Sequence, residues 1–317
     1  MLISVVSPVY NCTRCLPEIV RSVRETFQDS DFDWEIVFVD DRGPGEPWPV
    51  IQSLAQEDSR VHGVRLMRNH GQHLAIWAGL AYARGDWVAV IDCDLQDDPS
   101  VLMTLVERAR GGQSDAVVVD RGSWRDSLWR RAASRGFYAL LRSVTGFQIG
   151  GNGGNFGLYS RRMVENLLAF RDKEVFLPAM VVMTGLQREV HIVPRSDRFE
   201  GRSAYGLKQL LRFAVALIVR FSDRPLKISV VVGLGMSGVS ALLGLVIAIA
   251  WLSGRIQVQG WTSLILSIWF VGGLILSALG IHGFYIGRIF AEVQDRPRLR
   301  VLETAGKLPD IPQERMS

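Results

Sequence analysis

Two aspartates separated by one residue, Asp92 and Asp94, follow the apolar run Trp87–Ile91. In an extended segment, side chains two positions apart point to the same side, so both carboxylates can hold one divalent cation. Gln96 continues this face. Mg²⁺ prefers one or two carboxylates, together with phosphate oxygens and water, over a cage made entirely of protein ligands. The spacing therefore predicts a Mg²⁺ or Mn²⁺ site at Asp92, Asp94 and Gln96 that a diphosphate substrate completes.

Two neighbouring signals have simpler explanations. Asp97 or Asp98 can cap a helix that begins near Pro99, which would give these carboxylates a structural role. Cys12 and Cys15 form a CxxC pair, but a zinc ion needs more ligands than two thiols supply. Because the chain has three cysteines in all, neither a zinc site nor a disulfide framework is expected.

The elements that must position these residues alternate between strand and helix. Apolar, β-prone runs predict buried strands at Leu2–Ser7, Trp34–Val39, Val61–Met67 and Trp87–Ile91. Helical patterns follow the first three runs, at Cys15–Phe27, Pro49–Glu57 and His73–Ala83. The first strand is expected to end before Pro8, which cannot donate to a ladder. This order predicts a mostly parallel, Rossmann-like α/β sheet with right-handed crossovers and helices on both faces.

Polar residues stand at the carboxyl end of each predicted strand. They are Pro8-Val9-Tyr10-Asn11, Asp40-Asp41, Arg68-Asn69-His70-Gly71 and Asp92-Cys93-Asp94. Ligands of open α/β sheets bind at this edge. We therefore expect the four segments to converge on one site.

Two long apolar segments lie in the last third of the chain. No residue from Ile228 to Leu252 is charged, and the segment from Trp261 to Ile286 contains no Asp, Glu, Lys or Arg and one histidine, His282. At about 1.5 Å per residue, each segment can span the roughly 30 Å hydrocarbon core of a bilayer. Basic residues precede the first segment and follow the second, so the positive-inside rule predicts that both termini are cytosolic. Two buried helices of a soluble domain are the alternative.

Composition agrees with a protein that is partly embedded in a membrane. The 317 residues are 48% apolar and 21% charged, and 36 basic against 32 acidic side chains give a formal charge of +4. A disordered or fibrous chain is excluded. Residues 207–221 mix basic and apolar side chains, which predicts an interfacial helix whose basic groups face anionic head groups. No signal-peptide pattern opens the chain, and the few cysteines favour a reducing compartment.

The motifs together resemble the family 2 inverting glycosyltransferases of the GT-A fold. The segments that carry the resemblance are SVVSPVYN at 4–11, VFVDD at 37–41, RNHGQHLAIWAGLAYARGDW at 68–87 and DCDLQDDP at 92–99. Further features narrow it to the polyprenyl-phosphate glycosyltransferases, namely RFEGRSAYGLKQLL at 198–211, the two apolar segments and YIGRIFAEVQDRP at 285–297. That group includes undecaprenyl-phosphate glucosyl- and aminoarabinose transferases and dolichol-phosphate mannose synthase. The resemblance covers residues 2–300.

The resemblance implies roles at two substrates and a metal. The residues implied at the nucleotide of a nucleotide-sugar donor are Pro8, Tyr10, Asn11, Asp40, Asn69 and Asp92. Those implied at the metal and diphosphate are Asp92, Asp94 and Gln96. Those implied at the acceptor phosphate are Arg121, Arg130, Ser134, Arg135, Arg198 and Ser203. The expected catalytic residues are Asp92, Asp94, Arg130 and Arg198. The basic string around Arg130 is equally compatible with a solvated or lipid-facing helix face.

Three positions depart from the family pattern. Cys12 replaces a glutamate, Asn155 an aspartate and Ala204 a lysine. Asn155 removes a candidate catalytic base. A lipid monophosphate, however, has a second pKa near ~6 and is largely dianionic at neutral pH, so it needs positioning and not deprotonation. Transfer by one in-line displacement, with inversion at the anomeric carbon, remains feasible.

These inferences predict a GT-A domain at 1–206, an interfacial amphipathic helix at 207–227, a transmembrane hairpin at 228–288 with spans 228–252 and 261–286, and a cytosolic tail at 289–317. The expected function is metal-dependent transfer of one sugar from a nucleotide-sugar, a UDP-sugar, to undecaprenyl phosphate. The expected location is the bacterial cytoplasmic membrane, as a multi-pass protein whose catalytic domain is cytosolic. A catalytically idle membrane scaffold that keeps the fold is the alternative. The resemblance implies a homo-tetramer, and no nucleic-acid partner is expected.

Overall fold

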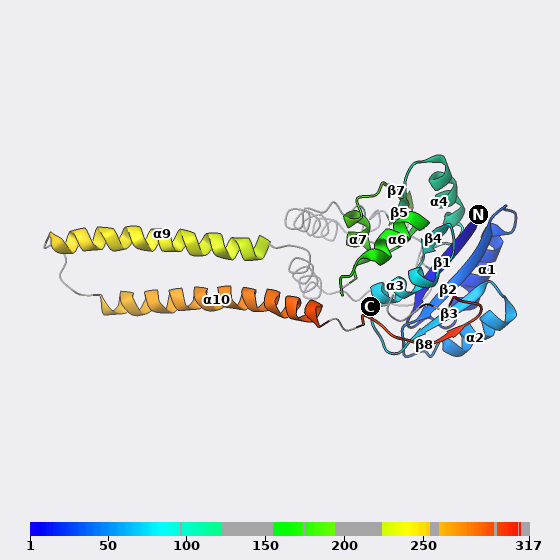
Figure 1. The fold of residues 1–317 in the computed structure, drawn as a ribbon, viewed down its shortest axis with the longest axis horizontal. Helices are drawn as coiled ribbons and strands as arrows, with labels where there is room; N and C mark the ends of the chain where they lie inside the picture. The colour runs from blue at the N-terminus through cyan, green and yellow to red at the C-terminus, as the bar shows by residue number, and fades with distance from the viewer. Residues whose placement is uncertain are drawn as a thin grey trace. The chain divides into compact units, whose positions relative to one another are not determined.

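In the computed structural model the described residues are 1–95, 97–121, 155–173, 175–193, 224–253, 260–294, 297–309 and 311 (Figure 1). They belong to two compact units. The first unit contains the described residues up to 193 together with those from 297 onward. The second contains the helices α9 (Arg224–Leu252) and α10 (Trp261–Val293).

The first unit is built on one eight-stranded sheet with the strand order β7-β5-β6-β4-β1-β2-β3-β8. The strands are β1 (Leu2–Val9), β2 (Asp33–Asp40), β3 (Val61–Leu66), β4 (Trp87–Val90), β5 (Ala116–Arg121), β6 (Gly157–Ser160), β7 (Arg188–Val193) and β8 (Val301–Ala305). Strands β4, β1, β2 and β3 are parallel, as are β5 and β7. β6 is antiparallel to β4 and β5, and β8 is antiparallel to β3. The predicted mostly parallel α/β sheet is confirmed.

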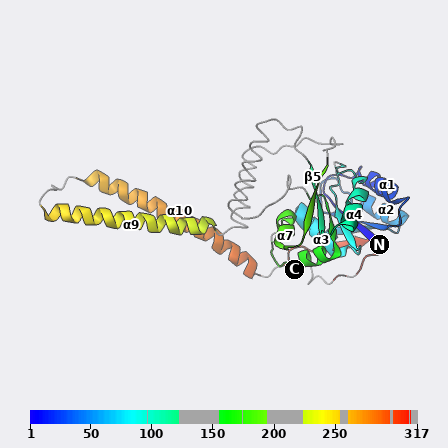
Figure 2. The ribbon, with the colours of Figure 1, turned by 90° about the horizontal axis from the view of Figure 1, so that it is seen from above.

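Helices cover both faces of this sheet (Figure 2). One face carries α1 (Leu16–Phe27), α2 (Trp48–Glu57) and α4 (Val101–Gly111). The other carries α3 (Gln72–Tyr82), α6 (Arg161–Ala169) and α7 (Leu177–Met183). Successive strand residues enter opposite cores, since Val5 packs on the first face and Val6 on the second. Burial on both faces explains why the central strands are continuous apolar runs.

The first strand does not end before Pro8, as the sequence had suggested. It continues to Val9, and Pro8 pairs with Val39 of β2. The Val9 carbonyl accepts from the Asp41 N–H on the β2 side, so Pro8, one residue earlier, directs its nitrogen toward β4. Pairing with β4 stops at Val6, so the missing N–H breaks no ladder bond.

The predicted tail at 289–317 begins inside α10 and contains a strand that was not expected from the sequence. β8 follows α10 and pairs with β3 at the edge of the sheet. The segment before it is anchored in the core, because Leu299 is 1% exposed and the Arg300 carbonyl accepts from the Met67 N–H at 2.8 Å. Arg298 donates from Nη2 to the Phe170 carbonyl at 2.7 Å.

The structure describes two helices of the second unit, α9 and α10, which contact each other. Within the described part of the chain, one segment, Ser267–Val293 of α10, is long and apolar enough to cross a membrane. α9 contains a shorter apolar stretch at Leu226–Met236. Apolar side chains along both helices, such as Leu234 and Leu276, are exposed. A two-helix transmembrane hairpin is therefore only partly supported by helix length and composition.

The helix bounds differ slightly from those expected. α9 begins at Arg224, so residues 224–227 of the predicted interfacial helix belong to it. α10 continues past Ile286 to Val293. Residues 207–223 of the predicted interfacial helix lie outside the described residues.

Candidate active site

The predicted site lies at the carboxyl ends of β1, β2, β3 and β4, which are neighbours in the sheet. Two backbone hydrogen bonds tie their exits together. The Asp41 N–H donates to the Val9 carbonyl at 2.9 Å, and the Ile91 N–H donates to the Val6 carbonyl at 3.0 Å. Parallel pairing thus brings the loops that carry Tyr10, Asp40 and Asp92 to one edge, as the sequence predicted.

Asp40, at the end of β2, is almost completely buried, with 1% of the residue exposed. Its Oδ1 accepts from the Arg42 N–H at 2.9 Å, and its Oδ2 lies 3.2 Å from Arg65 Nε. Burial raises the pKa of Asp40, while the Arg42 N–H and the charge of Arg65 oppose the increase. The carboxylate is thus held in one orientation at the edge where a nucleotide is expected.

Asp41 binds the backbone of a neighbouring loop. The sequence alone could not distinguish this structural role from the ligand-binding role expected of Asp40. Asp41 is 3% exposed, and its two oxygens accept from the N–H groups of His70 at 2.7 Å and Gly71 at 2.8 Å. Gly71 has φ +90°, a conformation that favours glycine. Asn69 Oδ1 also accepts from the Gly71 N–H, at 2.9 Å. Asp41 therefore fixes the loop that leads into α3.

The loop after β2 packs directly on the loop after β1. A Cβ at Gly43 would lie 1.3 Å from the Tyr10 carbonyl oxygen, so no other residue fits there without a shift of the backbone. Thr13 Oγ1 donates to the Gly45 carbonyl at 2.9 Å. Tyr10 is 48% exposed and Asn11 is exposed, which leaves both side chains accessible to a ligand. Pro8 is buried in β1.

The Asp92–Asp94 segment is held by two side chains outside it. Gln72 Nε2 donates to Asp92 Oδ1 at 2.6 Å, and the Asp92 N–H donates to Asp97 Oδ2 at 2.9 Å. Asp97 is 2% exposed, so it fixes the backbone of this loop from within. Leu95 has φ +57°, a sparsely populated conformation for a non-glycine residue. Both aspartates remain partly exposed.

The alternative that Asp97 or Asp98 caps a helix is not borne out, because Ser100 is the N-cap residue of α4 and no side-chain cap hydrogen bond is present there. Asp98 Oδ1 accepts from the Ser100 N–H at 2.9 Å, which closes the turn just before α4. Asp97 instead binds the backbone of Asp92. The sequence could not separate these roles, since both residues are aspartates in one turn.

The donor set fits a hard divalent cation only together with a substrate. Among the described residues there is no group of three or more His, Cys, Asp or Glu side chains that could hold a metal ion. Asp92 and Asp94 supply carboxylate oxygens, and Mg²⁺ or Mn²⁺ commonly combines one or two carboxylates with phosphate oxygens. Gln96 lies outside the described residues.

The three cysteines meet beside this segment. Cys12 Sγ donates to Cys15 Sγ at 2.7 Å, and the Cys93 thiol hydrogen-bonds to Cys12. The hydrogen bond to Cys93 and burial raise the pKa of Cys12, which keeps the thiol protonated and unreactive. The cysteines therefore pack the loop after β1 against the Asp92–Asp94 segment. The contact between Cys12 and Cys93 was not expected from the sequence.

The remaining predicted residues are only partly described. Asn155 precedes β6, is 7% exposed, and its Oδ1 has no hydrogen-bond partner among the described residues. The backbone of Arg121 ends β5, paired with Val193. The predicted acceptor residues that lie outside the described residues are Arg130, Ser134, Arg135, Arg198 and Ser203.

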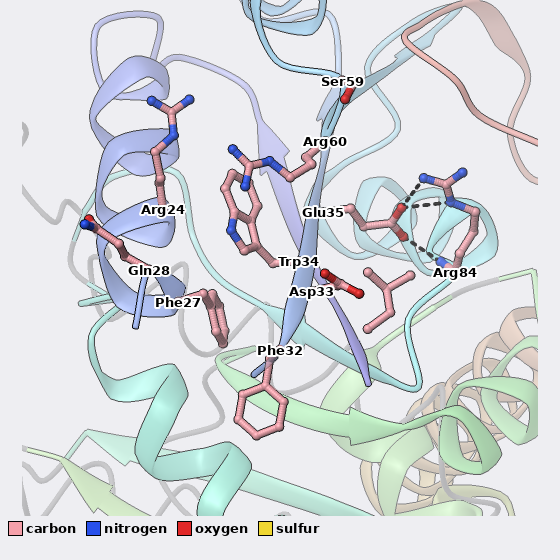
Figure 3. A pocket seen from close by; sticks show the side chains of 11 residues that line it. Arg24, Phe27, Gln28, Phe32, Asp33, Trp34, Glu35, Ser59, Arg60 and Arg84 are labelled. Atoms are coloured by element: carbon pink, nitrogen blue, oxygen red, sulfur yellow. Dashed lines mark hydrogen bonds and ion pairs between the residues drawn. The ribbon is translucent and has the colours of Figure 1, made fainter. Parts of the chain in front are cut away.

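A cavity of about 690 Å³ lies at the opposite, amino-terminal ends of β1 and β2 (Figure 3). Its arginines are engaged by acids, since Arg24 and Arg60 pair with Asp58, and Arg84 pairs with Glu35. Arg60 also lies 4.0 Å above the ring of Trp34. This cavity is a structural ion-pair region, separate from the edge that carries Asp40 and Asp92.

Glu35 in this cavity predicts a pH-dependent contribution to stability. Burial raises its pKa, but hydrogen bonds from His62, Ser4 and Arg84 outweigh burial and lower the pKa to about 2. A lowered carboxyl pKa contributes stability above the unfolded pKa, near 4.5, and loses it as the pH falls toward 2. We expect Glu35→Gln to cost on the order of 3 kcal/mol at pH 7.

The measurement is the thermal midpoint of the detergent-solubilised chain between pH 3 and 7. The deficit of Glu35→Gln should be largest at pH 7 and should shrink toward pH 3. Glu25→Gln is the control, because Glu25 is exposed and lies 3.9 Å from Arg21 at the surface. A deficit of equal size at every pH would show that Glu35 does not titrate with a lowered pKa.

Comparisons with known proteins match most of the chain. The sequence pattern of the family Glycosyl transferase family 2 matches residues 4–168. The SfII prophage-derived bactoprenol glucosyl transferase of Shigella flexneri is 34% identical over 299 residues, covering 94% of this chain and 96% of that protein. The undecaprenyl-phosphate 4-deoxy-4-formamido-L-arabinose transferase of Pseudomonas fluorescens is 32% identical over 314 residues, covering 98% and 92%.

Solved structures show the same fold at low identity. A glucosyl-3-phosphoglycerate synthase from Mycobacterium tuberculosis, in complex with Mn²⁺, uridine diphosphate and glucosyl-3-phosphoglycerate, has a TM-score of 0.52 and 19% identity, covering 70% of this chain and 80% of that chain. A mannosyl-3-phosphoglycerate synthase from Rubrobacter xylanophilus has a TM-score of 0.50 and 18% identity, covering 72% and 74%.

Proposed function

The chain belongs to glycosyl transferase family 2, among its polyprenyl-phosphate glycosyltransferases, and from this premise we propose that it transfers one sugar from a UDP-sugar to undecaprenyl phosphate. The observation that carries the proposal is the convergence of Asp40, Asp92 and Asp94 at one edge of the sheet, where hydrogen bonds hold the Asp40 carboxylate and the backbone of Asp92. The relatives' names supply the acceptor class, and the UDP in the solved neighbour supplies the donor class.

In the proposed reaction, the side chains at the sheet edge hold the donor. Asp40 and the exposed Tyr10 and Asn11 surround the nucleoside, and Asp92 and Asp94 lie where the diphosphate is expected. A Mg²⁺ or Mn²⁺ ion, when bound to these two aspartates and Gln96, would offset the negative charge that develops on the leaving diphosphate.

The acceptor phosphate is the nucleophile. One of its oxygens forms a bond to the anomeric carbon while the bond from that carbon to the diphosphate oxygen breaks, which inverts the configuration. A dianionic phosphate needs no base, so its orientation is the main requirement. An arginine guanidinium suits this role, because it donates bidentately to phosphate oxygens. We assign the orientation of the acceptor phosphate to Arg121, Arg130, Ser134, Arg135, Arg198 and Ser203. This assignment rests on the family motifs.

The proposed membrane topology is a hairpin. α9 and α10 lie in the chain between β3 and β8, and these two strands pair within one sheet. A chain that leaves a domain and returns to it crosses a membrane an even number of times. Ser267–Val293 is long and apolar enough to be one crossing, and we propose that α9 is the second crossing that parity then calls for. The catalytic domain and both termini then lie in the cytosol.

Reporter fusions test this topology. A reporter at the C-terminus is expected to show a cytosolic location, and an epitope inserted after Ser253 is expected to be accessible from the opposite side. A C-terminus on the outer side would contradict the hairpin, since β8 could not then pair with β3.

A second candidate is a catalytically idle membrane subunit. Asn155 and Ala204 favour it, because both replace residues that carry charge in the family pattern. The ordered contacts of Asp40, Asp92 and Asp97 argue against it, since an idle domain does not need a preorganised edge.

The direct test is a transfer assay. The purified full-length chain is incubated with undecaprenyl phosphate, Mg²⁺ or Mn²⁺, and separately with UDP-, GDP- and other nucleotide-sugars. Transfer of a labelled sugar into the lipid fraction from a UDP-sugar supports the proposal. Transfer from a different nucleotide would correct the donor, and no transfer from any donor would favour the idle subunit.

A further inference from the structure

The strand that follows α10 reaches the candidate nucleotide site through one side chain. In the antiparallel pair of β3 and β8, Glu303 stands directly opposite Arg65. The register then shifts, so that Leu66 is opposite Val301 and Leu302 is the extra residue. Such a bulge re-aims side chains next to it. Here the strand irregularity coincides with the contact between Glu303 and Arg65.

Arg65 lies between two carboxylates. Its Nη1 donates to Glu303 Oε1 at 2.7 Å, and its Nε lies 3.2 Å from Asp40 Oδ2. The Arg65 side chain is 20% exposed, Glu303 is 40% exposed and Asp40 is 1% exposed, so the arginine joins a solvent-facing acid to a buried one. Its guanidinium also lies 5.6 Å from the centre of the Trp48 ring.

We propose that Glu303 is a positioning residue of the donor site, which orients Arg65 so that Arg65 in turn holds the carboxylate of Asp40 in place for the nucleoside. This inference rests on the proposed function, in which Asp40 contacts the donor nucleotide. With this role, the segment that follows α10 becomes part of the nucleotide pocket, although Glu303 lies 238 residues from Arg65 in the chain.

The physical argument is one of orientation. An arginine side chain has many rotamers, and the hydrogen bond to Glu303 together with the ion pair to Asp40 restricts them. Without Glu303, Arg65 retains its contact with Asp40 but loses the partner that fixes the other end of its guanidinium. Because Glu303 and Arg65 are partly exposed, the pair is expected to have a moderate effect. We expect a weakening of nucleotide binding of about three- to tenfold, which corresponds to roughly 0.7–1.4 kcal/mol.

The test measures the dissociation constants of UDP, GDP and ADP, each with Mn²⁺, for the full-length chain in detergent by isothermal titration calorimetry. The nucleotide that the unmodified protein binds most tightly is then titrated into Glu303→Gln, Arg65→Met and the double variant. If Glu303 acts through Arg65, the double variant should bind as Arg65→Met does. Glu303→Asp, which retains the charge, should recover part of the loss.

Glu189→Gln is the matched control. Glu189 pairs with Arg108, and its side chain is about as exposed as that of Glu303, but it lies on β7 at the other edge of the sheet. It should bind nucleotide as the unmodified protein does. A Glu303→Gln variant with unchanged affinity, or with the same loss in the Arg65→Met background, would overturn the positioning role and leave the donor site standing. If the unmodified protein binds none of the three nucleotides, the donor site fails, and the role of Glu303 fails with it.

Discussion

Sugar transfer is expected to fall by at least ~10²–10³-fold when Asp94 is replaced by alanine, while the protein remains folded. Asp94 is a partly exposed residue in the loop after β4, so its side chain contributes charge at the rim more than packing in the core. Removal of a group that stabilises developing charge has effects of this size. The measurement is the initial rate of sugar incorporation into undecaprenyl phosphate, together with the thermal midpoint.

Asp98→Ala is the control for this experiment. Asp98 is an exposed aspartate in the same loop, and it accepts a hydrogen bond from the Ser100 N–H. Its replacement should leave most of the rate intact. Excess EDTA should abolish transfer by the unmodified protein, and added Mg²⁺ or Mn²⁺ should restore it. Full activity in EDTA, or an Asp94→Ala variant as active as the parent, would show that the segment is not a metal site.

The central sheet could be predicted from the sequence because its signals are local. The runs that form β1 to β4 are apolar on both faces, and each is separated from the next by a helix of ordinary length. Right-handed crossovers then leave few arrangements. The boundaries were less predictable. The expected first strand ended too early, at Pro8. A proline breaks a strand only where its nitrogen faces a paired neighbour, and the nitrogen of Pro8 faces β4 beyond the point where pairing stops.

The antiparallel strands could not be predicted in the same way. β6 reads GLYS and β8 reads VLETA, so neither of these short strands has the apolar run that marks β4. Their partners are set by tertiary contacts, and β8 pairs with β3 across more than 230 residues of chain. No local pattern encodes a pairing of that range. The contact between Glu303 and Arg65 was hidden for the same reason.

The candidate site, like the sheet, could be predicted only in part. Residue type and strand ends identified Asp40, Asp92 and Asp94 as possible ligands, but type could not show that Asp41 and Asp97 serve the backbone instead. All five are aspartates at one edge of the sheet. Only the hydrogen-bond partners show that Asp41 and Asp97 fix loops, whereas Asp92 and Asp94 remain partly exposed at the rim.

Asn155→Asp is expected to weaken the fold without raising the rate. Asn155 is 7% exposed, and its Oδ1 has no hydrogen-bond partner among the described residues. An ionised carboxylate in the same place would be buried without a partner in the part of the chain that the structure describes, so either its pKa rises until it is neutral or the folded state loses stability. We expect the free energy of unfolding to fall by about 2–4 kcal/mol at pH 7 to 8.

The same variant tests whether the reaction needs a base. If a carboxylate were required at this position, Asn155→Asp would raise turnover by the ~10²–10⁴-fold typical of general-base catalysis. A dianionic acceptor phosphate needs none, so the rate should change little in either direction. Below about pH 6 the rates of both forms should fall together, because the lipid phosphate then takes up its proton.

The assay compares transfer rates and thermal midpoints of the two forms between pH 5.5 and 8. Asn166→Asp is the control, since Asn166 lies exposed on α6 and donates to the Arg162 carbonyl at 2.8 Å. That change should alter neither quantity by much. A large gain in rate for Asn155→Asp would contradict the base-free displacement and show that the asparagine limits the enzyme. No turnover by either form, with any nucleotide-sugar, would instead favour the idle subunit, because a missing base could not then explain the inactivity.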